Sequence, residues 1–361
     1  MQAGGECPVA GKKIIVAGHI CLDITPVFSA GNPQPLNRLL APGKLVQMEG
    51  VDLHTGGAVA NTGLALKILG ANVELMGKVG DDDFGRLILE RLQRYDAAEG
   101  MIVSPDSTTS YSIVIAPPGT DRIFLHNPGA NDTFRAADID EEKLAGAAWF
   151  HFGYPPLMRY MYAEDGAELA EIFRRARAAG LHTSLDMAAV DPESDAGRAD
   201  WTLILRRVLR YVDCFVPSVE ELCFMADRPR YEGWLRRAQG GDVTTVLDLE
   251  EDIRPLARQV LALGAHELLI KCGTPGLYYT DGTTERFERS YKPARVLSGT
   301  GAGDTSIAAF LKAKLDGCPL ETCLHYAAGT GASCVEAYDA LSGLRSFAEL
   351  DKKMAAGWEK L

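Results

Sequence analysis

The sequence has little positive charge for its length and no long apolar run. Its 361 residues contain 37 Lys and Arg against 49 Asp and Glu, a formal net charge of −12. A surface that binds nucleic acid needs clustered basic side chains, so this balance excludes a general nucleic-acid-binding protein. No apolar run approaches the length of a membrane span, and the short Gly-rich start, residues 1–13, has no apolar signal core. We therefore expect a cytoplasmic protein without a membrane partner.

Motifs that would indicate several other chemistries are also missing. The eight cysteines include no C-x-x-C pair, and the seven histidines show neither H-x-x-x-H nor H-E-x-x-H spacing, so no structural zinc is expected. There is no G-x-x-x-x-G-K-[ST] segment, which excludes a P-loop enzyme. Residues 18–23 (Gly-His-Ile-Cys-Leu-Asp) follow the first apolar run, but they lack the G-x-G-x-x-G of a dinucleotide-binding fold.

What the chain does have is a regular alternation of strand and helix signals. Residues 14–18 form an uninterrupted apolar run that is typical of a buried strand. Hydrophobic residues make up 47% of the chain, which at this length is enough for a sizeable core. The alternation predicts an α/β fold with a doubly wound, mostly parallel sheet and helices on both faces, as one domain over residues 12–361.

Three segments interrupt this alternation. Residues 44–55 partly alternate, as a half-exposed strand pair would, and residues 110–126 indicate a hairpin around Pro117-Pro118-Gly119-Thr120. We expect both to form a small β sheet that stands off the main domain as an active-site lid, within segments of about 40–56 and 108–127. Residues 228–248 have no place in the alternation and indicate an insertion.

The strongest chemical signal is a glycine-rich turn that leads directly into a helix, residues 298–304 (Ser-Gly-Thr-Gly-Ala-Gly-Asp). Small residues let the backbone approach a ligand, and the first amides of a helix lack partners. Gly301, Ala302 and Gly303 are therefore predicted to form an anion hole. Asp304 can take the proton of an attacking hydroxyl, as the base of a phosphoryl transfer does. The alternative is that Asp304 only caps its helix.

In two regions the sequence resembles the ribokinase family of carbohydrate kinases, also called the PfkB family. The first comprises residues 56–65 (Gly-Gly-Ala-Val-Ala-Asn-Thr-Gly-Leu-Ala) and continues to residues 77–85 (Gly-Lys-Val-Gly-Asp-Asp-Asp-Phe-Gly). The second is residues 301–304, and the resemblance covers nearly the whole chain. It implies a ribokinase-like enzyme that transfers the γ-phosphoryl group of ATP to a sugar or nucleoside hydroxyl, with Mg2+.

The resemblance also implies roles for single residues around the acceptor. Asp304 corresponds to the catalytic base, and the backbone of residues 301–303 to the anion hole. Four residues correspond to groups that bind the sugar: Asp23, Gly56, Gly57 and Asn61. Local sequence explains two of them equally well in another way, because Asp23 can be a turn residue before Pro26 and Asn61 can cap its own helical turn.

On the nucleotide side, five residues are expected to contact ATP: Lys271, Gly273, Thr274, Gly276 and Thr300. An ordinary turn explains residues 273–276 as well. Glu221 corresponds to the carboxylate that holds hydrated Mg2+ through water. The family usually has Asp-Thr where this chain has Ser298-Gly299, and Asn where it has Ser218. Activation by a monovalent cation therefore stays open.

The sequence thus predicts an ATP-dependent carbohydrate kinase whose partners are small molecules. One alternative is a nucleoside kinase of the same fold, with Phe28, Tyr111 or Phe124 of the lid as candidates to clamp the base. The other is a catalytically weak, sugar-sensing regulatory protein. Exposed strand edges in the lid would favour a homodimer that pairs through the lid. A monomer whose lid edges are covered is equally consistent with the sequence.

Overall fold

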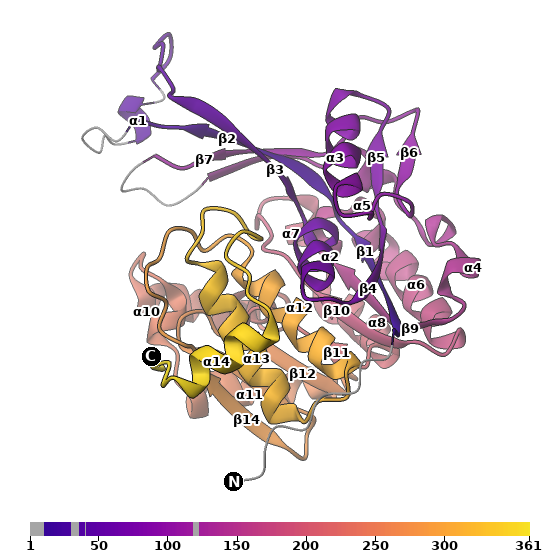
Figure 1. Cartoon of the computed structure of the whole chain (residues 1–361), viewed down its shortest axis with the longest axis vertical. Coiled ribbons are helices and arrows are strands. Elements are labelled where there is room, and N and C mark those ends of the chain that lie inside the picture. Colours follow the sequence, from indigo (N-terminus) through magenta and orange to yellow (C-terminus); the bar gives the residue numbers. More distant parts are fainter. Residues whose placement is uncertain (1–10, 30–35, 40, 118–122) are drawn as a thin grey trace.

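The largest element of the fold is an eight-stranded sheet, which we call the main sheet. The computed structural model describes residues 11–29, 36–39, 41–117 and 123–361 (Figure 1). The eight strands of the main sheet have the order β14-β13-β12-β11-β10-β9-β1-β4. Their bounds are β1 (Lys13–Gly18), β4 (Asn72–Met76), β9 (Ala147–Gly153), β10 (His182–Asp186), β11 (Cys214–Phe215), β12 (Glu267–Lys271), β13 (Gly276–Thr280) and β14 (Glu285–Arg289). Neighbours from β4 to β12 pair in parallel, whereas β12–β13 and β13–β14 are antiparallel. The predicted mostly parallel sheet is confirmed.

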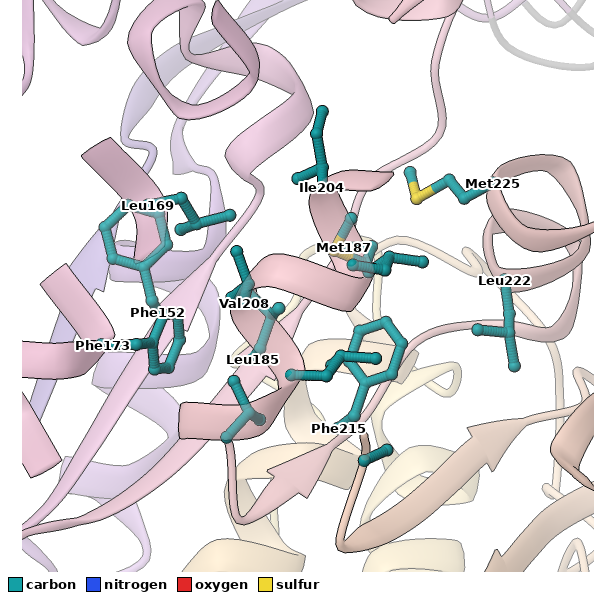
Figure 2. Close-up of a cluster of buried hydrophobic side chains, with 14 of the residues drawn as sticks. Phe152, Leu169, Phe173, Leu185, Met187, Ile204, Val208, Phe215, Leu222 and Met225 are labelled. Atoms are coloured by element: carbon teal, nitrogen blue, oxygen red, sulfur yellow. The ribbon is translucent and has the colours of Figure 1, made fainter. Parts of the chain in front are cut away.

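Helices cover both faces of this sheet. Successive residues of a strand point to opposite sides, and in β1 the side chains on both sides are apolar and need to be buried. Ile15 and Ala17 belong to a buried cluster with residues of α6 (Ala167–Ala178), α8 (Trp201–Val208), α9 (Val219–Ala226) and α11 (Arg254–Ala262), part of which Figure 2 shows. Ile14 and Val16 belong to a second cluster with residues of α2 (Ala58–Ile68), α12 (Ala302–Leu315) and α13 (Leu320–Cys334). Alternate residues of β1 therefore pack against helices on opposite faces of the sheet, as a doubly wound fold requires.

The remaining helices are shorter or lie at the edges of these two layers. They are α1 (Leu36–Leu39), α3 (Asp83–Gln93), α4 (Glu141–Leu144), α5 (Arg159–Tyr162), α7 (Asp195–Arg198), α10 (Arg228–Ala238) and α14 (Phe347–Ala355). A short parallel pair, β5 (Lys78–Gly80) and β6 (Ile102–Ser104), stands apart from the main sheet. Over the described ranges, no helix has both the length and the apolar composition that crossing a membrane would require.

A second sheet projects from the main body (Figure 1), and we call it the projecting sheet. Its four strands lie in the order β3 (Gly50–Gly56), β2 (Cys21–Val27), β7 (Tyr111–Ile115) and β8 (Ile123–Asn127). β3 and the β7–β8 hairpin fall in the two segments predicted for a lid. Residues 40 and 118–122, which belong to the same segments, lie outside the described residues.

The predicted strand pair within residues 44–55 is wrong. Residues 44–49 form no strand, and β3 pairs instead with β2, which continues the chain directly from the main sheet. Sequence reasoning missed β2 because its polar residues and Pro26 suggested a turn. β2 lies between β3 and β7, and it carries the chain and its Asp23 from the main sheet into the projecting sheet.

The segment predicted as an insertion is tied to the main body. It starts with α10 and ends near a short 3-10 turn at residues 243–246. Trp234 is buried, and its indole N–H donates to Asp252 at 2.9 Å. Arg237 forms an ion pair with the same carboxylate. That this segment is an insertion stays a prediction.

Candidate active site

Helix α12 begins at the glycine turn that the sequence singled out. Gly301 is its N-cap with φ of 75°, and a Cβ atom there would lie 2.2 Å from Cβ of Ala340. Only glycine fits this left-handed, crowded position. The Ala302 N–H makes a long contact to the Gly299 carbonyl, at 3.4 Å. The Gly303 amide follows at the second helical position, where a helix itself offers no acceptor.

Asp304 lies in the first turn of α12, yet it does not cap the helix. The N-cap is Gly301, and the carboxylate of Asp304 bonds to side chains from other parts of the chain. The Asn61 amide donates to Oδ2 at 3.1 Å, and the Tyr154 hydroxyl lies 2.8 Å from each carboxylate oxygen. The Thr62 hydroxyl is 3.4 Å from Oδ1. The capping alternative is therefore wrong.

Opposing effects act on the protonation of Asp304, which is only 5% exposed. Burial raises the pKa of this carboxyl above its ordinary value. The charge of Lys271 and the hydrogen bonds from Tyr154 and Asn61 hold the rise back, because each favours the ionised form. Buried carboxyls with opposing influences of this kind are typical of sites that exchange a proton.

The start of α2 brings Asn61 to this carboxylate. Gly57 is the N-cap of α2 with φ of 84°, and a Cβ there would lie 2.5 Å from the His19 carbonyl oxygen. The Asn61 side chain reaches Asp304, 243 positions along the chain, and does not cap its own turn. That alternative is also wrong. Helices α2 and α12 thus face each other across the site with their N-terminal turns.

Asp23 lies on β2, opposite His54 of β3, and not in a turn. Its carboxylate packs against Gly56, where a Cβ atom would lie 2.2 Å from Oδ2. Burial raises the pKa of Asp23 to about 6, while the Cys21 thiol and His54 hold it back. Asp304 contributes to the rise, so the two predicted acceptor-side carboxylates lie within electrostatic reach of each other.

Lys271 ends β12 beside the glycine turn. Its Nζ lies 2.6 Å from Oδ1 of Asp186, the last residue of β10. A Cβ atom on Gly303 would lie 3.2 Å from Cδ of Lys271, so the lysine runs along the first turn of α12. Burial lowers the pKa of Lys271, but the charges of Asp186 and Glu221 outweigh it and hold the pKa above its ordinary value. A buried cation thus lies next to the predicted anion hole.

The other residues predicted for the nucleotide lie in two turns. Gly273 and Gly276, with φ of 67° and 137°, belong to the link between β12 and β13, and Thr274 between them is exposed. A Cβ on Gly276 would lie 2.1 Å from the Glu288 carbonyl oxygen, so the hairpin itself requires this glycine. In the second turn, the Thr300 N–H donates to the Ser298 hydroxyl at 3.1 Å. Contact of these residues with a nucleotide stays a prediction.

Glu221 lies in the first turn of α9, and Ser218 is the N-cap of that helix. The Ser218 hydroxyl accepts from the Glu221 N–H, and Oε2 of Glu221 accepts from the Ser218 N–H at 2.8 Å. This reciprocal capping box explains how Ser replaces the usual Asn of the family pattern. Glu221 also raises the pKa of Asp186 and Asp304, which places its charge near both.

Sequence reasoning missed two residues of this site, Tyr154 and Asp186. Tyr154 directly follows β9, and Asp186 is the last residue of β10. The available signal was their place, because ligands of parallel sheets bind at the carboxyl ends of strands. Asp186 is fully buried with Oδ2 unpartnered among the described residues, and burial raises its pKa while the charge of Lys271 holds the rise back.

The chain matches known proteins over nearly its full length. The model of the pfkB family carbohydrate kinases matches residues 13–346. An uncharacterized sugar kinase of Archaeoglobus fulgidus is 23% identical over 286 residues, which cover 78% of this chain and 98% of that protein. Ribokinase of Arabidopsis thaliana, solved with ribose and ATP, superposes with a TM-score of 0.73 at 21% identity, covering 95% of this chain and 98% of that one.

A fructokinase of Xylella fastidiosa with bound ATP has the same fold, with a TM-score of 0.70 at 20% identity and coverage of 96% and 99%. These two structures support the ribokinase-like fold, and the family match covers both glycine-containing regions of the sequence. The chain therefore belongs to the pfkB family and is a carbohydrate kinase.

Proposed function

We propose that this kinase transfers the γ-phosphoryl group of ATP to a hydroxyl of a sugar, with Asp304 as the base. The observation that carries the proposal is the Asp304 carboxylate itself. It is buried at the start of α12, where the amides of the first helical turn favour an anion, and it is held by Asn61 of α2 and by Tyr154, which follows β9. A base and an anion site thus lie within one helical turn of each other.

In the proposed reaction, Asp304 accepts the proton of the acceptor hydroxyl as that oxygen attacks the γ-phosphorus. A new P–O bond forms, the bond between the γ-phosphorus and the bridging oxygen breaks, and ADP leaves with the bonding electron pair. The amides of residues 301–303 and the Lys271 ammonium stabilise the charge on the transferred group. The Asp186 carboxylate holds Lys271 in place from its other side.

The residues on the nucleotide side fit ATP and Mg2+. Gly301 and Gly303 are partly exposed and carry no side chain that would cover the backbone of the turn. Oε2 of Glu221 is bonded to the Ser218 amide, and Oε1 has no hydrogen bond within the described ranges, so it can accept from water bound to Mg2+. The ion would neutralise phosphate charge during the transfer.

On the acceptor side, uncharged groups lie near the Asp23 carboxylate. Asp23, Ser112 and His126 come from three strands of the projecting sheet, and Ser112 lies 3.0 Å from the His126 ring. Both ring nitrogens of His19 lack partners among the described residues, and burial holds the pKa of His19 well below its ordinary value. A neutral imidazole offers one donor and one acceptor, and Asp23 offers acceptors. This set suits the hydroxyls of a neutral sugar, over which the projecting sheet would act as a lid.

The test is acceptor-dependent ADP release with Mg-ATP, screened over pentoses, hexoses, keto-acid sugars and nucleosides. Wild type should respond to a neutral sugar. Asp304→Asn should lower turnover with that sugar by at least about a thousandfold, because the base is lost, while nucleotide binding stays within about twofold. Asp316→Asn, a matched change at the opposite end of α12, should leave both unchanged.

Near-normal turnover of Asp304→Asn would remove the proposed base. A response to nucleosides alone would favour the nucleoside kinase, although the Tyr111 ring packs edge-on against Phe84 at 5.6 Å and so is already engaged. No response to any acceptor would favour the regulatory protein.

We also propose that the projecting sheet pairs with that of a second copy of the chain. Its outer strands β3 and β8 are edges, and β8 exposes three consecutive apolar residues: Ile123 (37%), Phe124 (54%) and Leu125 (51%). Exposed apolar strands at an open edge favour pairing with another chain.

A further inference from the structure

Tyr154 has an unusual backbone for its residue type. It follows the last residue of β9 with φ of 65° and ψ of 42°, in the left-handed region. Bulky side chains rarely adopt this conformation, and the residue before a proline is restricted further. Pro155 and Pro156 follow it directly, and its N–H donates to the Asp186 carbonyl at 3.3 Å. Such backbone positions persist where the surroundings enforce them and are enriched at functional sites.

The result of this backbone is that the Tyr154 hydroxyl lies 2.8 Å from both oxygens of Asp304. A carboxylate has about four lone-pair positions. The Tyr154 hydroxyl lies between the two oxygens and occupies one lone-pair position on each. The Asn61 amide takes a second position on Oδ2, and the Thr62 hydroxyl takes a second position on Oδ1. An acceptor hydroxyl can therefore bond to Asp304 only after one of these donors leaves.

Of these donors, Asn61 is the one suited to leave. When the acceptor sugar binds, the Asn61 amide can release Asp304 and bond instead to a second hydroxyl of that sugar, since an amide both donates and accepts. Tyr154 cannot follow the substrate in this way, because its backbone is fixed between β9 and two prolines. Thr62 is fully buried within α2.

We propose that Tyr154 is a positioning residue that stays bonded to Asp304 through turnover, and that the acceptor hydroxyl takes the place of Asn61. This rests on the proposed role of Asp304. The tyrosine fixes the plane of the carboxylate and partly neutralises its charge before the acceptor binds. Burial and the charge of Asp304 raise the pKa of Tyr154 well above its ordinary value, so the hydroxyl keeps the proton that it donates.

The test compares the pH profiles of Tyr154→Phe and Asn61→Ala. The profile of kcat/KM reports the free enzyme, whereas that of kcat reports the enzyme with both substrates bound. Loss of a donor raises the pKa of Asp304, so the acidic limb, where the base becomes protonated, moves to higher pH. Tyr154→Phe should move the limb in both profiles, because its bond persists. Asn61→Ala should move it only in kcat/KM and should raise the acceptor KM.

Tyr154→Phe should also lower kcat by about ten- to a hundredfold, the value of a hydrogen bond to a charged group, with both KM values within about twofold. The control is Tyr162→Phe in α5. The Tyr162 ring packs against Trp201, and this variant should behave as wild type. Rates are expressed per ADP-binding site, so that any unfolded fraction does not count as lost activity.

The inference is overturned if the kcat profile of Tyr154→Phe keeps the wild-type limb, or if this change raises the acceptor KM at unchanged kcat. Either outcome together with an inactive Asp304→Asn variant leaves the proposed function intact. An active Asp304→Asn variant rejects the proposed function itself, whatever Tyr154→Phe does.

Discussion

At the scale of single residues, Asp304 collects partners from three separate parts of the chain. Asn61 comes from α2, Tyr154 from the end of β9 and Lys271 from the end of β12. Each favours the ionised carboxylate, while burial favours the neutral acid. If Asp304 is the base that we propose, this balance lets it stay ionised before the reaction and still accept a proton late in it.

Asp23 is the residue where function and stability should conflict. Its folded-state pKa is raised from 3.8 to about 6. A raised pKa means that its contribution to stability is fully present below the unfolded value and is lost as the pH rises to about 6. Asp23→Asn should therefore raise the free energy of unfolding by about 1–3 kcal/mol at pH 7, with little change near pH 4, and weaken acceptor binding.

Denaturant titrations at both pH values and the acceptor KM measure this prediction. Asp52→Asn is the control, because Asp52 is exposed on β3, and it should change stability by less than about 0.5 kcal/mol. Equal effects of Asp23→Asn at the two pH values would show that its carboxylate carries no burial cost.

At the scale of elements, the site depends on where α12 begins. Gly301 and Gly317 flank this helix, both with φ of 75°. A Cβ on Gly301 would collide with Ala340, whereas a Cβ on Gly317 meets nothing within 4 Å. The two glycines therefore separate the cost of a left-handed backbone from the cost of crowding.

Gly317→Ala should lower the free energy of unfolding by about 1–2 kcal/mol and leave turnover unchanged. Gly301→Ala should cost about 1–3 kcal/mol more and reduce turnover, because relief of the clash shifts the first turn of α12 and Asp304 with it. Denaturant titration and the ADP-release assay measure both. Similar turnover in the two variants would mean that the start of the helix tolerates this shift.

The sequence predicted secondary-structure elements correctly where the signal was local. The apolar run at residues 14–18 predicted β1, and the turn at residues 298–304 predicted the start of α12, because each signal lies within a short stretch of the chain. The prediction of a strand pair within residues 44–55 failed, because β3 pairs with the earlier strand β2, from Cys21 opposite Gly56 to Val27 opposite Gly50. A half-exposed strand does not identify its partner by its own pattern.

At the scale of the whole molecule, pairing of two projecting sheets would give a particle of twice the chain mass. Phe124→Asp should shift the sedimentation of the protein from that of a dimer to that of a single chain, because a charge would be placed within the apolar edge of β8. Val296→Asp, at an exposed apolar residue outside the projecting sheet, is the control and should leave the mass unchanged. A wild-type protein that sediments as a single chain at all concentrations would contradict the proposed dimer.

The sequence by itself determined the parts of this protein whose signals are local. The alternation of strands and helices defined the mostly parallel sheet, and the turn at residues 298–304 indicated an anion site with its neighbouring carboxylate. Only the tertiary structure decided what surrounds that carboxylate. Tyr154 and Asn61 lie 150 and 243 positions away from Asp304 along the chain, and Asp186 meets Lys271 across 85. Residue spacing carries no record of such contacts, because they arise when parallel strands bring their carboxyl ends to one edge of a sheet.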